Sequence, residues 1–237
     1  MIDIHTHILP GIDDGSENLN QSMDMAKIAY EVGFTDIITT SHYMENIYEA
    51  DTKDRRYLIN NLSDELKKEG INLKLYNGAE IYFTEEFPDM IERGLIPTLA
   101  GSKYVLFEFP LTDKVVYLYS LLFKLKKMGL VPIIAHPERY QIVKENIDIT
   151  EEWIDNGALI QCNYGSILGI YGKHAKKTLL TLLKKDRVTF LGTDAHSPHL
   201  YADMDKILKL YKKKIGNKKL EELTEINPKK IINNEDI

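Results

Sequence analysis

The chain has 237 residues, of which 43% are hydrophobic and 28% charged, as in a soluble globular protein long enough to bury a core without disulfides. Its net charge of −6 gives no electrostatic reason to expect a nucleic-acid partner. The one cysteine excludes an internal disulfide, and neither a signal peptide nor an apolar run of the roughly 20 residues needed for a membrane span is present, so we predict a cytoplasmic protein without a transmembrane segment.

Short apolar runs alternate with stretches of helical spacing along the chain. The predicted strands are Ile2–Ile4, Asp36–Thr40, Asn72–Tyr76, Lys103–Phe107, Val131–Ile134, Ala158–Gln161 and Val188–Leu191. The predicted helices are Asn18–Val32, Lys53–Lys68, Thr84–Arg93, Asp113–Met128 and Ala175–Lys185. This alternation indicates βα units and a parallel sheet. Since no linker or low-complexity tract interrupts it, we predict one α/β domain over residues 1–237.

Polar side chains follow the predicted strands, at the point where each strand ends. In chain order they are His5 and His7, His42, Glu80, Glu108, His136, Asn163, and Asp194 with His196. In a β/α barrel the C-terminal ends of the strands meet at one face, which carries the catalytic groups. Packing alone would favour apolar residues at these positions, because a buried charge without a partner is costly. The pattern therefore predicts a single site built from residues far apart in the sequence.

Two of these pairs share a spacing that suits metal binding. His5 and His7, and likewise Asp194 and His196, are two residues apart and so point to the same side of an extended segment. The full set of candidate ligands is His5, His7, Asp14, His42, Glu80, Glu108, His136, Asp194 and His196. Any one of them alone is more often a surface or hydrogen-bonded group, but the joint pattern predicts metal. Imidazole and carboxylate without thiolate suit Mn, Fe, Zn or Mg, and so many ligands favour several ions bridged by a carboxylate such as Glu80.

The motifs in which these residues lie resemble a known superfamily. The segments Asp3–Ser16, Gly78–Ile81 and Ala135–Tyr140, together with Asp194-x-His196, resemble the polymerase-and-histidinol-phosphatase (PHP) superfamily. Within it, they are most similar to the bacterial protein-tyrosine phosphatases of capsule and exopolysaccharide operons. The resemblance covers nearly the whole chain. It implies a distorted, PHP-like (β/α) barrel of about seven parallel strands that holds three divalent metal ions, usually manganese.

The resemblance also implies roles for individual residues. It places one ion on His5, His7, Glu80 and Asp194, a second on Glu80, Glu108 and His136, and a third on Asp14, His42 and His196. Arg139 matches an arginine that holds the substrate phosphate. The proton donor to the leaving group is our own hypothesis from the chemistry of the reaction, which assigns this role to either His196 or His42. Relatives carry another arginine shortly after Asp-x-His, whereas the segment Ser197–Lys212 contains none. His199 and Lys206 lie there, but neither has the planar, two-pronged geometry of a guanidinium.

The implied activity is hydrolysis of phosphotyrosine by a metal-bound hydroxide. The implied substrate is the tyrosine-rich tail of a bacterial tyrosine kinase that regulates capsule or exopolysaccharide synthesis, so the enzyme would be recruited to a membrane-bound kinase complex. Two alternatives stay open: a small-molecule phosphomonoesterase such as histidinol-phosphate phosphatase, and a non-catalytic module that captures phosphotyrosine. The sequence does not predict the oligomeric state.

Three further features are interpreted as structural. Cys162 lies in an apolar run and is expected to pack in the core or at its rim rather than to act as a nucleophile. Arg55 and Arg56 are interpreted as exposed charges on a helix surface rather than as a pair that steers a phosphopeptide. The lysines around Lys212–Lys214 are interpreted as a solvated helix face rather than as a docking surface.

Overall fold

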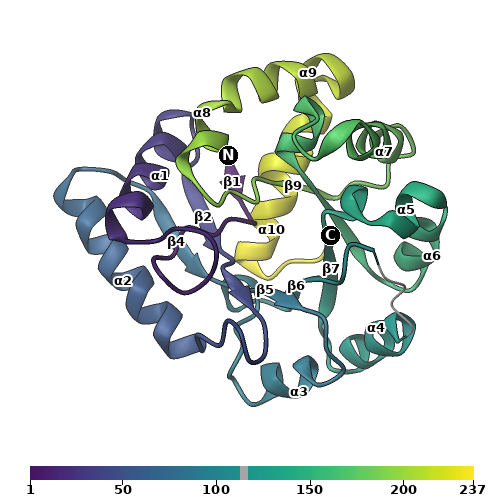
Figure 1. Ribbon diagram of the computed structural model, residues 1–237, viewed down its shortest axis with the longest axis horizontal. Coiled ribbons are helices and arrows are strands. Elements are labelled where there is room, and N and C mark those ends of the chain that lie inside the picture. Colours follow the sequence, from purple (N-terminus) through teal and green to yellow (C-terminus); the bar gives the residue numbers. More distant parts are fainter. Residues whose placement is uncertain (113–116) are drawn as a thin grey trace.

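The computed structural model describes residues 1–112 and 117–237 and has parallel strands at the centre with helices around them (Figure 1). The strands are β1 (Ile2–Asp3), β2 (Asp36–Thr39), β3 (His42–Tyr43), β4 (Lys74–Asn77), β5 (Glu80–Tyr82), β6 (Tyr104–Glu108), β7 (Val131–Ala135), β8 (Leu159–Asn163) and β9 (Phe190–Gly192). The α-helices are α1 (Leu19–Glu31), α2 (Thr52–Lys68), α3 (Phe87–Glu92), α4 (Leu118–Lys127), α5 (Gln141–Glu145), α6 (Ile149–Asp155), α7 (Gly172–Lys184), α8 (Pro198–Ala202), α9 (Met204–Glu221) and α10 (Asn227–Asn233). Short helical turns are η1 (Leu99–Gly101), η2 (Pro137–Arg139), η3 (Tyr164–Leu168) and η4 (Glu222–Ile226).

Every pair of neighbouring strands is parallel, which confirms the predicted α/β class. The strands form a three-stranded sheet in the order β1-β2-β4 and a six-stranded sheet in the order β3-β5-β6-β7-β8-β9. The described residues thus contain more strands, β1 to β9, than the seven that were predicted. The difference arises because the chain leaves the ladder after β2 and again after β4, and resumes pairing in the second sheet as β3 and β5.

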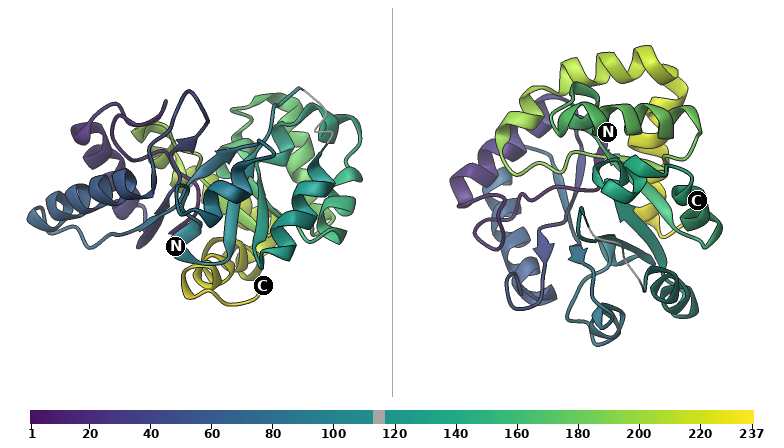
Figure 2. Two further views of the ribbon diagram at one scale, coloured as in Figure 1. Left: turned by 90° about the horizontal axis from the view of Figure 1, so that it is seen from below. Right: turned by 45° about the vertical axis from the view of Figure 1, so that its right-hand side comes forward.

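Backbone hydrogen bonds connect the two sheets where the strands are interrupted. The N–H of Thr40 donates to the carbonyl of Thr6, and the N–H of Glu80 donates to the carbonyl of Thr40. A parallel bridge between Thr6 and Ala195 links the segment after β1 to the segment after β9. The two further views show the same arrangement of curled strands inside a layer of helices (Figure 2).

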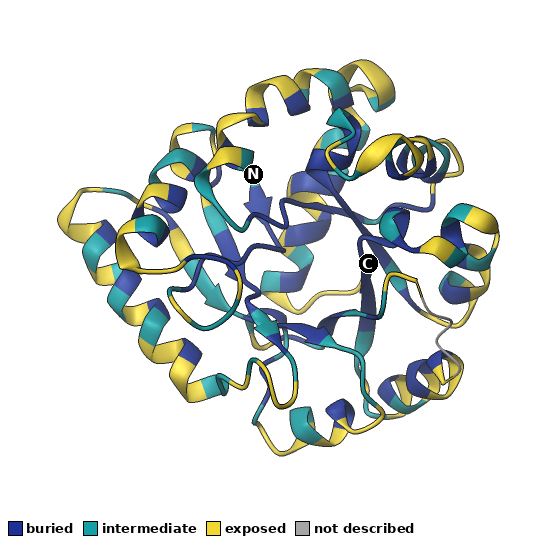
Figure 3. Ribbon diagram, in the orientation of Figure 1, coloured by how far each residue is buried: buried dark blue, intermediate teal, exposed yellow. Residues whose placement is uncertain are grey.

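The core follows the alternation of side chains along the strands. One apolar cluster joins the strands to α10 and includes Ile4, Leu106 and Ile133 together with Ile231 of that helix. A larger cluster lies between the strands and the outer helices, and includes Phe107 of β6. Figure 3 shows buried strands and helices that expose only their outer faces. The polar ligands therefore stand at strand ends above a closed apolar interior.

Some predicted elements differ from the structure. The predicted helix Asp113–Met128 begins in residues that lie outside the described ranges, and its described part contains α4. The helices α5, α8 and α10 were not predicted, whereas α9 carries Lys212–Lys214, which were interpreted as part of a helix face. None of the helices within the described ranges combines the length and the apolar character required to cross a bilayer.

Candidate metal centre

The nine predicted ligands lie together at one end of the parallel strands, where most of the strands end and where β3 and β5 begin with His42 and Glu80. In three groups the ligand atoms are all within 4.8 Å of one another: His5, His7, Glu80 and Asp194; His7, Asp14, His42 and His196; and His42, Glu80 and Glu108. The first group is the set implied for one ion. The second is the set implied for another ion with His7 added. In the third, His42 takes the place expected for His136, which lies beside the group, with its Nε2 2.9 Å from Glu80 Oε1 and 3.5 Å from Glu108 Oε2.

Glu80 occupies the middle of this arrangement, at the first residue of β5. Its Oε2 lies 3.1 Å from His5 Nε2, 3.2 Å from His7 Nε2 and 3.3 Å from His42 Nδ1. The side chain is 1% exposed. A carboxylate that faces several imidazoles with both oxygens has the geometry of a bridging ligand.

Two of the candidate ligands have an unusual backbone conformation. His136 directly follows β7 with φ 34° and ψ 52°, and Asp194 follows β9 with φ 54°. Residues other than glycine rarely adopt positive φ, and each such residue costs of order 1–3 kcal/mol when it is held in a sparsely populated region. Strain of this kind is concentrated at functional sites, and here it turns both side chains toward Glu80.

Close backbone approaches also shape the centre. A Cβ on Gly15 would lie 2.2 Å from the carbonyl oxygen of His7, and one on Gly192 would lie 2.7 Å from Cβ of His5. Both glycines are therefore required by space, because any side chain would push a candidate ligand away.

Two residues that orient the first histidines were not identified from the sequence. Gln161 Oε1 lies 2.9 Å from His5 Nδ1, and Asp13 Oδ2 lies 2.8 Å from His7 Nδ1. Each oxygen accepts a hydrogen bond from Nδ1, which leaves the Nε2 lone pair free for a metal ion. Asp13 also accepts the backbone N–H of His42. Two features of the sequence could have indicated these residues: Gln161 is polar within an apolar strand, and Asp13 precedes the predicted ligand Asp14.

Without cations, the charges of the centre are poorly balanced. Burial favours the neutral form of Glu108, and the negative charges of Glu80 and Asp194 add to this effect and raise its pKa to about 9. Burial alone would lower the pKa of His5, but the carboxylates of Glu80 and Asp194 outweigh it and raise the pKa to about 9. These groups therefore take up protons where positive charge is lacking.

Buried polar atoms without a hydrogen-bond partner also indicate that the centre requires cations. Glu80 Oε2 and His42 Nδ1 are buried, face each other and have no hydrogen-bond partner among the described residues. His136 Nδ1 is also buried without one. A cation between such acceptors would satisfy them, whereas leaving them unpaired is costly. The donor set therefore fits divalent cations.

Arg139, predicted to hold phosphate, lies at the edge of the centre on η2. Its Nη1 is 2.9 Å from Asp194 Oδ2, and its guanidinium carbon lies 4.7 Å from the centre of the Tyr171 ring. The neighbouring Glu138 is fully buried and accepts hydrogen bonds from the Asn163 N–H and the Ser166 hydroxyl. These bonds hold η2, and with it Arg139, against η3.

A hollow of about 230 Å³ adjoins the candidate ligands Asp194 and His196. Its other walls include Ile170, Tyr171 and Leu200. A cavity of roughly 150 Å³ is large enough for benzene. The hollow therefore has room for one aromatic ring beside the centre.

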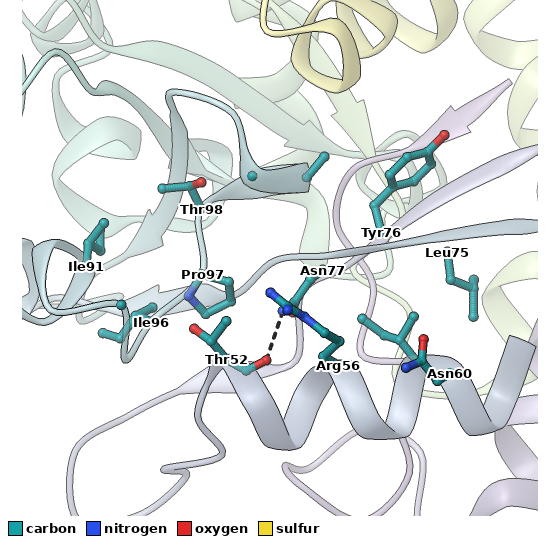
Figure 4. A pocket seen from close by; sticks show the side chains of 14 residues that line it. Thr52, Arg56, Asn60, Leu75, Tyr76, Asn77, Ile91, Ile96, Pro97 and Thr98 are labelled. Carbon is teal, nitrogen blue, oxygen red and sulfur yellow. Dashed lines mark hydrogen bonds between the residues drawn. The ribbon is translucent and has the colours of Figure 1, made fainter.

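Another hollow, of about 500 Å³, lies between α2, β4 and the segment after α3 (Figure 4). Its walls include Arg56, Tyr76 and Thr98, and the Asn77 side chain donates a hydrogen bond to the Thr52 carbonyl within it. None of the nine predicted ligands lines this hollow. It is therefore separate from the centre.

The structure contradicts the interpretation of Arg55 as an exposed helix charge. Arg55 is fully buried, and its guanidinium donates to four backbone carbonyls, those of Ser41, His42, Ala50 and Gly78. These carbonyls lie close to both strand interruptions, so the guanidinium supports the backbone that carries His42 and Glu80. Arg56 is exposed, as expected. Cys162 is fully buried, and burial raises its pKa well above the usual value, so its thiol stays protonated.

Comparisons with known proteins identify relatives over the whole length. The sequence model of a family described as "Capsular polysaccharide synthesis, CpsB/CapC" matches residues 1–233. The putative tyrosine-protein phosphatase CapC of Staphylococcus aureus is 37% identical over 199 residues, covering 83% of this chain and 77% of its own. The tyrosine-protein phosphatase CpsB of Streptococcus pneumoniae is 31% identical over 242 residues, covering 98% of both. A crystal structure of a similar protein comes from work on YwqE of Bacillus subtilis and CpsB of Streptococcus pneumoniae, which are described as unique metal-dependent tyrosine phosphatases. It superposes on this structure with a TM-score of 0.94 at 32% sequence identity. The match covers 100% of this chain and 96% of the other chain.

Proposed function

Because this chain belongs to the CpsB/CapC family of capsular polysaccharide synthesis, we propose that it is a metal-dependent tyrosine-protein phosphatase. The observation that carries the proposal is the convergence of imidazoles and carboxylates around Glu80 at the ends of parallel strands. Such a donor set suits divalent cations and has no thiolate nucleophile. The substrate would be the phosphotyrosine-bearing tail of a bacterial tyrosine kinase that regulates capsule or exopolysaccharide synthesis.

The centre is proposed to hold three divalent ions, with manganese as the first candidate and Fe, Zn or Mg as the alternatives. His5, His7, Glu80 and Asp194 would hold one, Glu80 and Glu108 with His136 or His42 a second, and Asp14, His42 and His196 a third. When bound, the cations supply Lewis-acid chemistry, because they polarise the phosphoryl oxygens and lower the pKa of water toward neutrality.

The remaining roles fall to side chains at the edge of the centre. Arg139 donates hydrogen bonds to a nonbridging phosphate oxygen and offsets its charge, while Tyr171 supports the guanidinium from one side. Of the two predicted proton donors, His196 is 35% exposed and His42 is 12% exposed, so His196 is the more accessible. Both also belong to the ligand set of the third ion, and a nitrogen that binds a cation carries no proton, so either histidine would act as a donor only when it does not bind that ion. A phenolate is a fairly good leaving group, because phenols have a pKa near 10, so protonation contributes modestly. The hollow beside Asp194 receives the aromatic ring of the phosphotyrosine.

The proposal includes the wider setting. Residues 1–237 act as one domain in which the two sheets form a distorted, PHP-like barrel. The barrel has seven strands when β2 with β3, and β4 with β5, are each counted as one interrupted strand. The protein works in the cytoplasm and is recruited to a membrane-bound kinase complex.

Metal analysis combined with turnover measurements tests the proposed function. Purified protein is analysed for bound metal and assayed, before and after chelation, with a phosphotyrosine peptide and with histidinol phosphate. We expect manganese-dependent hydrolysis of the phosphotyrosine peptide in preference to histidinol phosphate. Preference for histidinol phosphate would favour a small-molecule phosphatase, and peptide binding without turnover would favour a non-catalytic module. Activity that resists chelation and requires Cys162 would exclude the metal mechanism.

A further inference from the structure

A third hollow, which has no role in the proposed function, shares Tyr171 with the hollow beside Asp194 and His196. It has a volume of about 570 Å³ and lies between α5 and the first turn of α7, which are neighbours in Figure 1. Its lining residues are Gln141, Lys144, Glu145, Tyr171, Gly172, Lys173 and His174. We call it the α5–α7 hollow.

Tyr171 connects this hollow to the site of reaction. Its side chain lines both the α5–α7 hollow and the hollow beside Asp194 and His196. The guanidinium of Arg139 lies over its ring and contacts Asp194. The α5–α7 hollow and the hollow beside Asp194 therefore share one lining residue, so a peptide with its phosphotyrosine at the metal centre would reach the α5–α7 hollow past Tyr171.

The charges in the α5–α7 hollow favour an anion. Within the described ranges, neither Lys144 nor Lys173 forms an ion pair, as is also the case for most of the lysines there, so both ammonium groups are available to a ligand. The one carboxylate in the lining is that of Glu145, and it accepts a hydrogen bond from Gln141. Two lysines without partners thus share a concave surface with one acid, and His174 lies beside them.

The position of Lys173 does not serve the stability of α7. The first turn of this helix contains no acidic residue, and Lys173 lies in it. A cation at a helix N-terminus opposes the helix dipole, at a cost of typically 0.3–1 kcal/mol. A binding role explains why Lys173 is placed where it weakens the helix that carries it.

We propose that the α5–α7 hollow is a second anion subsite, which binds a negatively charged side chain of the same peptide that presents its phosphotyrosine to the metal centre. The charged group is a phosphate or a carboxylate, contributed by a second phosphotyrosine or by an acidic residue near the first. The subsite rests on the proposed function and deepens it, because it makes acidic or multiply phosphorylated peptides the preferred substrates.

Three phosphotyrosine peptides test the subsite, differing only in their flanking residues: glutamates, a second phosphotyrosine, or glutamines. The variant Lys144→Glu/Lys173→Glu is compared with the control Lys212→Glu/Lys213→Glu, which makes the same change of charge at exposed positions on α9. The preference for acidic peptides is measured as kcat/KM for an acidic peptide divided by kcat/KM for the neutral peptide. We expect Lys144→Glu/Lys173→Glu to lower this preference by about tenfold, mainly through KM, because two weak attractions between lysine and anion become repulsions. The control should keep the wild-type ratio. The glutamate and second-phosphotyrosine arms show which anion the subsite prefers.

A binding measurement separates failure of the subsite from failure of the proposed function. Fluorescence anisotropy reports the affinities of non-hydrolysable phosphonate analogues of the three peptides, and it needs no turnover. An equal preference for acidic over neutral analogues in wild type and Lys144→Glu/Lys173→Glu would overturn the subsite, as would an equal loss of preference in the control. Wild-type protein that fails to hydrolyse p-nitrophenyl phosphate after addition of manganese would instead overturn the proposed function.

Discussion

Replacing Arg55 by methionine tests how the metal centre is supported from beneath. The guanidinium makes four hydrogen bonds to backbone carbonyls at 2.6–3.3 Å and has no carboxylate partner within residues 1–112 and 117–237. Methionine keeps much of the volume but leaves these buried carbonyls without a donor, at about 1–3 kcal/mol for each one that water cannot reach. Removing the desolvated charge offsets part of this loss, since burial lowers the pKa of Arg55 to about 10. We expect a net destabilisation of about 3 kcal/mol, or a fall in Tm of roughly 6–12 °C for a protein of this size.

The neighbouring Arg56 provides the matched control for this experiment. It is one residue along the same helix but exposed, so Arg56→Met should change stability by less than about 0.5 kcal/mol. Urea unfolding followed by circular dichroism measures both variants. Because Arg55 binds the carbonyls of Ser41, His42 and Gly78, its loss should also weaken manganese binding about 10- to 100-fold in titrations of metal-free protein. Equal unfolding midpoints and equal manganese affinities for the two variants would refute the supporting role of Arg55.

Four other outcomes are expected. Chelation should abolish activity and lower Tm by roughly 5–10 °C. The reason is that cations that bind only the folded state, at a concentration 100 times their Kd, add about 2.7 kcal/mol to the free energy of unfolding. Full activity in metal-depleted protein would contradict this. Glu80→Gln, which keeps shape but removes the central charge, should lower metal content and reduce kcat/KM by at least about 100-fold, while the exposed Glu85→Gln should leave both unchanged. Cys162→Ser should keep activity within about twofold in a phosphatase assay, because its buried thiol stays protonated, and a large loss would revive a covalent mechanism. Asp51→Ala removes the capping box that begins α2 and should cost about 1 kcal/mol in urea unfolding, with no change in metal content.

The fold class and the meeting of the candidate ligands could both be predicted from the sequence, for a physical reason. Apolar runs alternate with helical stretches, and parallel strands bring their C-terminal ends to one face, so residues that follow such strands must come together. The distance between Glu80 and His136 along the chain is therefore no obstacle to their contact at 2.9 Å.

Features that depend on tertiary contacts could not be predicted. The short strands β3 and β5, which follow the interruptions after β2 and β4, were not predicted, because they depend on hydrogen bonds from Thr40 and Glu80 to carbonyls that only the folded chain brings near. For the same reason, Arg55 and Arg56 are equivalent in the sequence, although one is buried among carbonyls and the other exposed. The orienting role of Gln161 depends on its meeting His5, which lies 156 positions away.

Backbone geometry, rather than the side chains alone, positions the candidate ligands. His136 and Asp194 reach Glu80 from left-handed conformations, and His42 and Glu80 begin new strands just after the interruptions. These arrangements are locally unfavourable, and so are the unpaired acceptors that they bring together. The apolar packing beneath the centre must stabilise them, together with the buried Arg55 and the cations themselves. It follows that metal binding and folding are coupled, so a change at Arg55 that touches no ligand should still alter metal affinity.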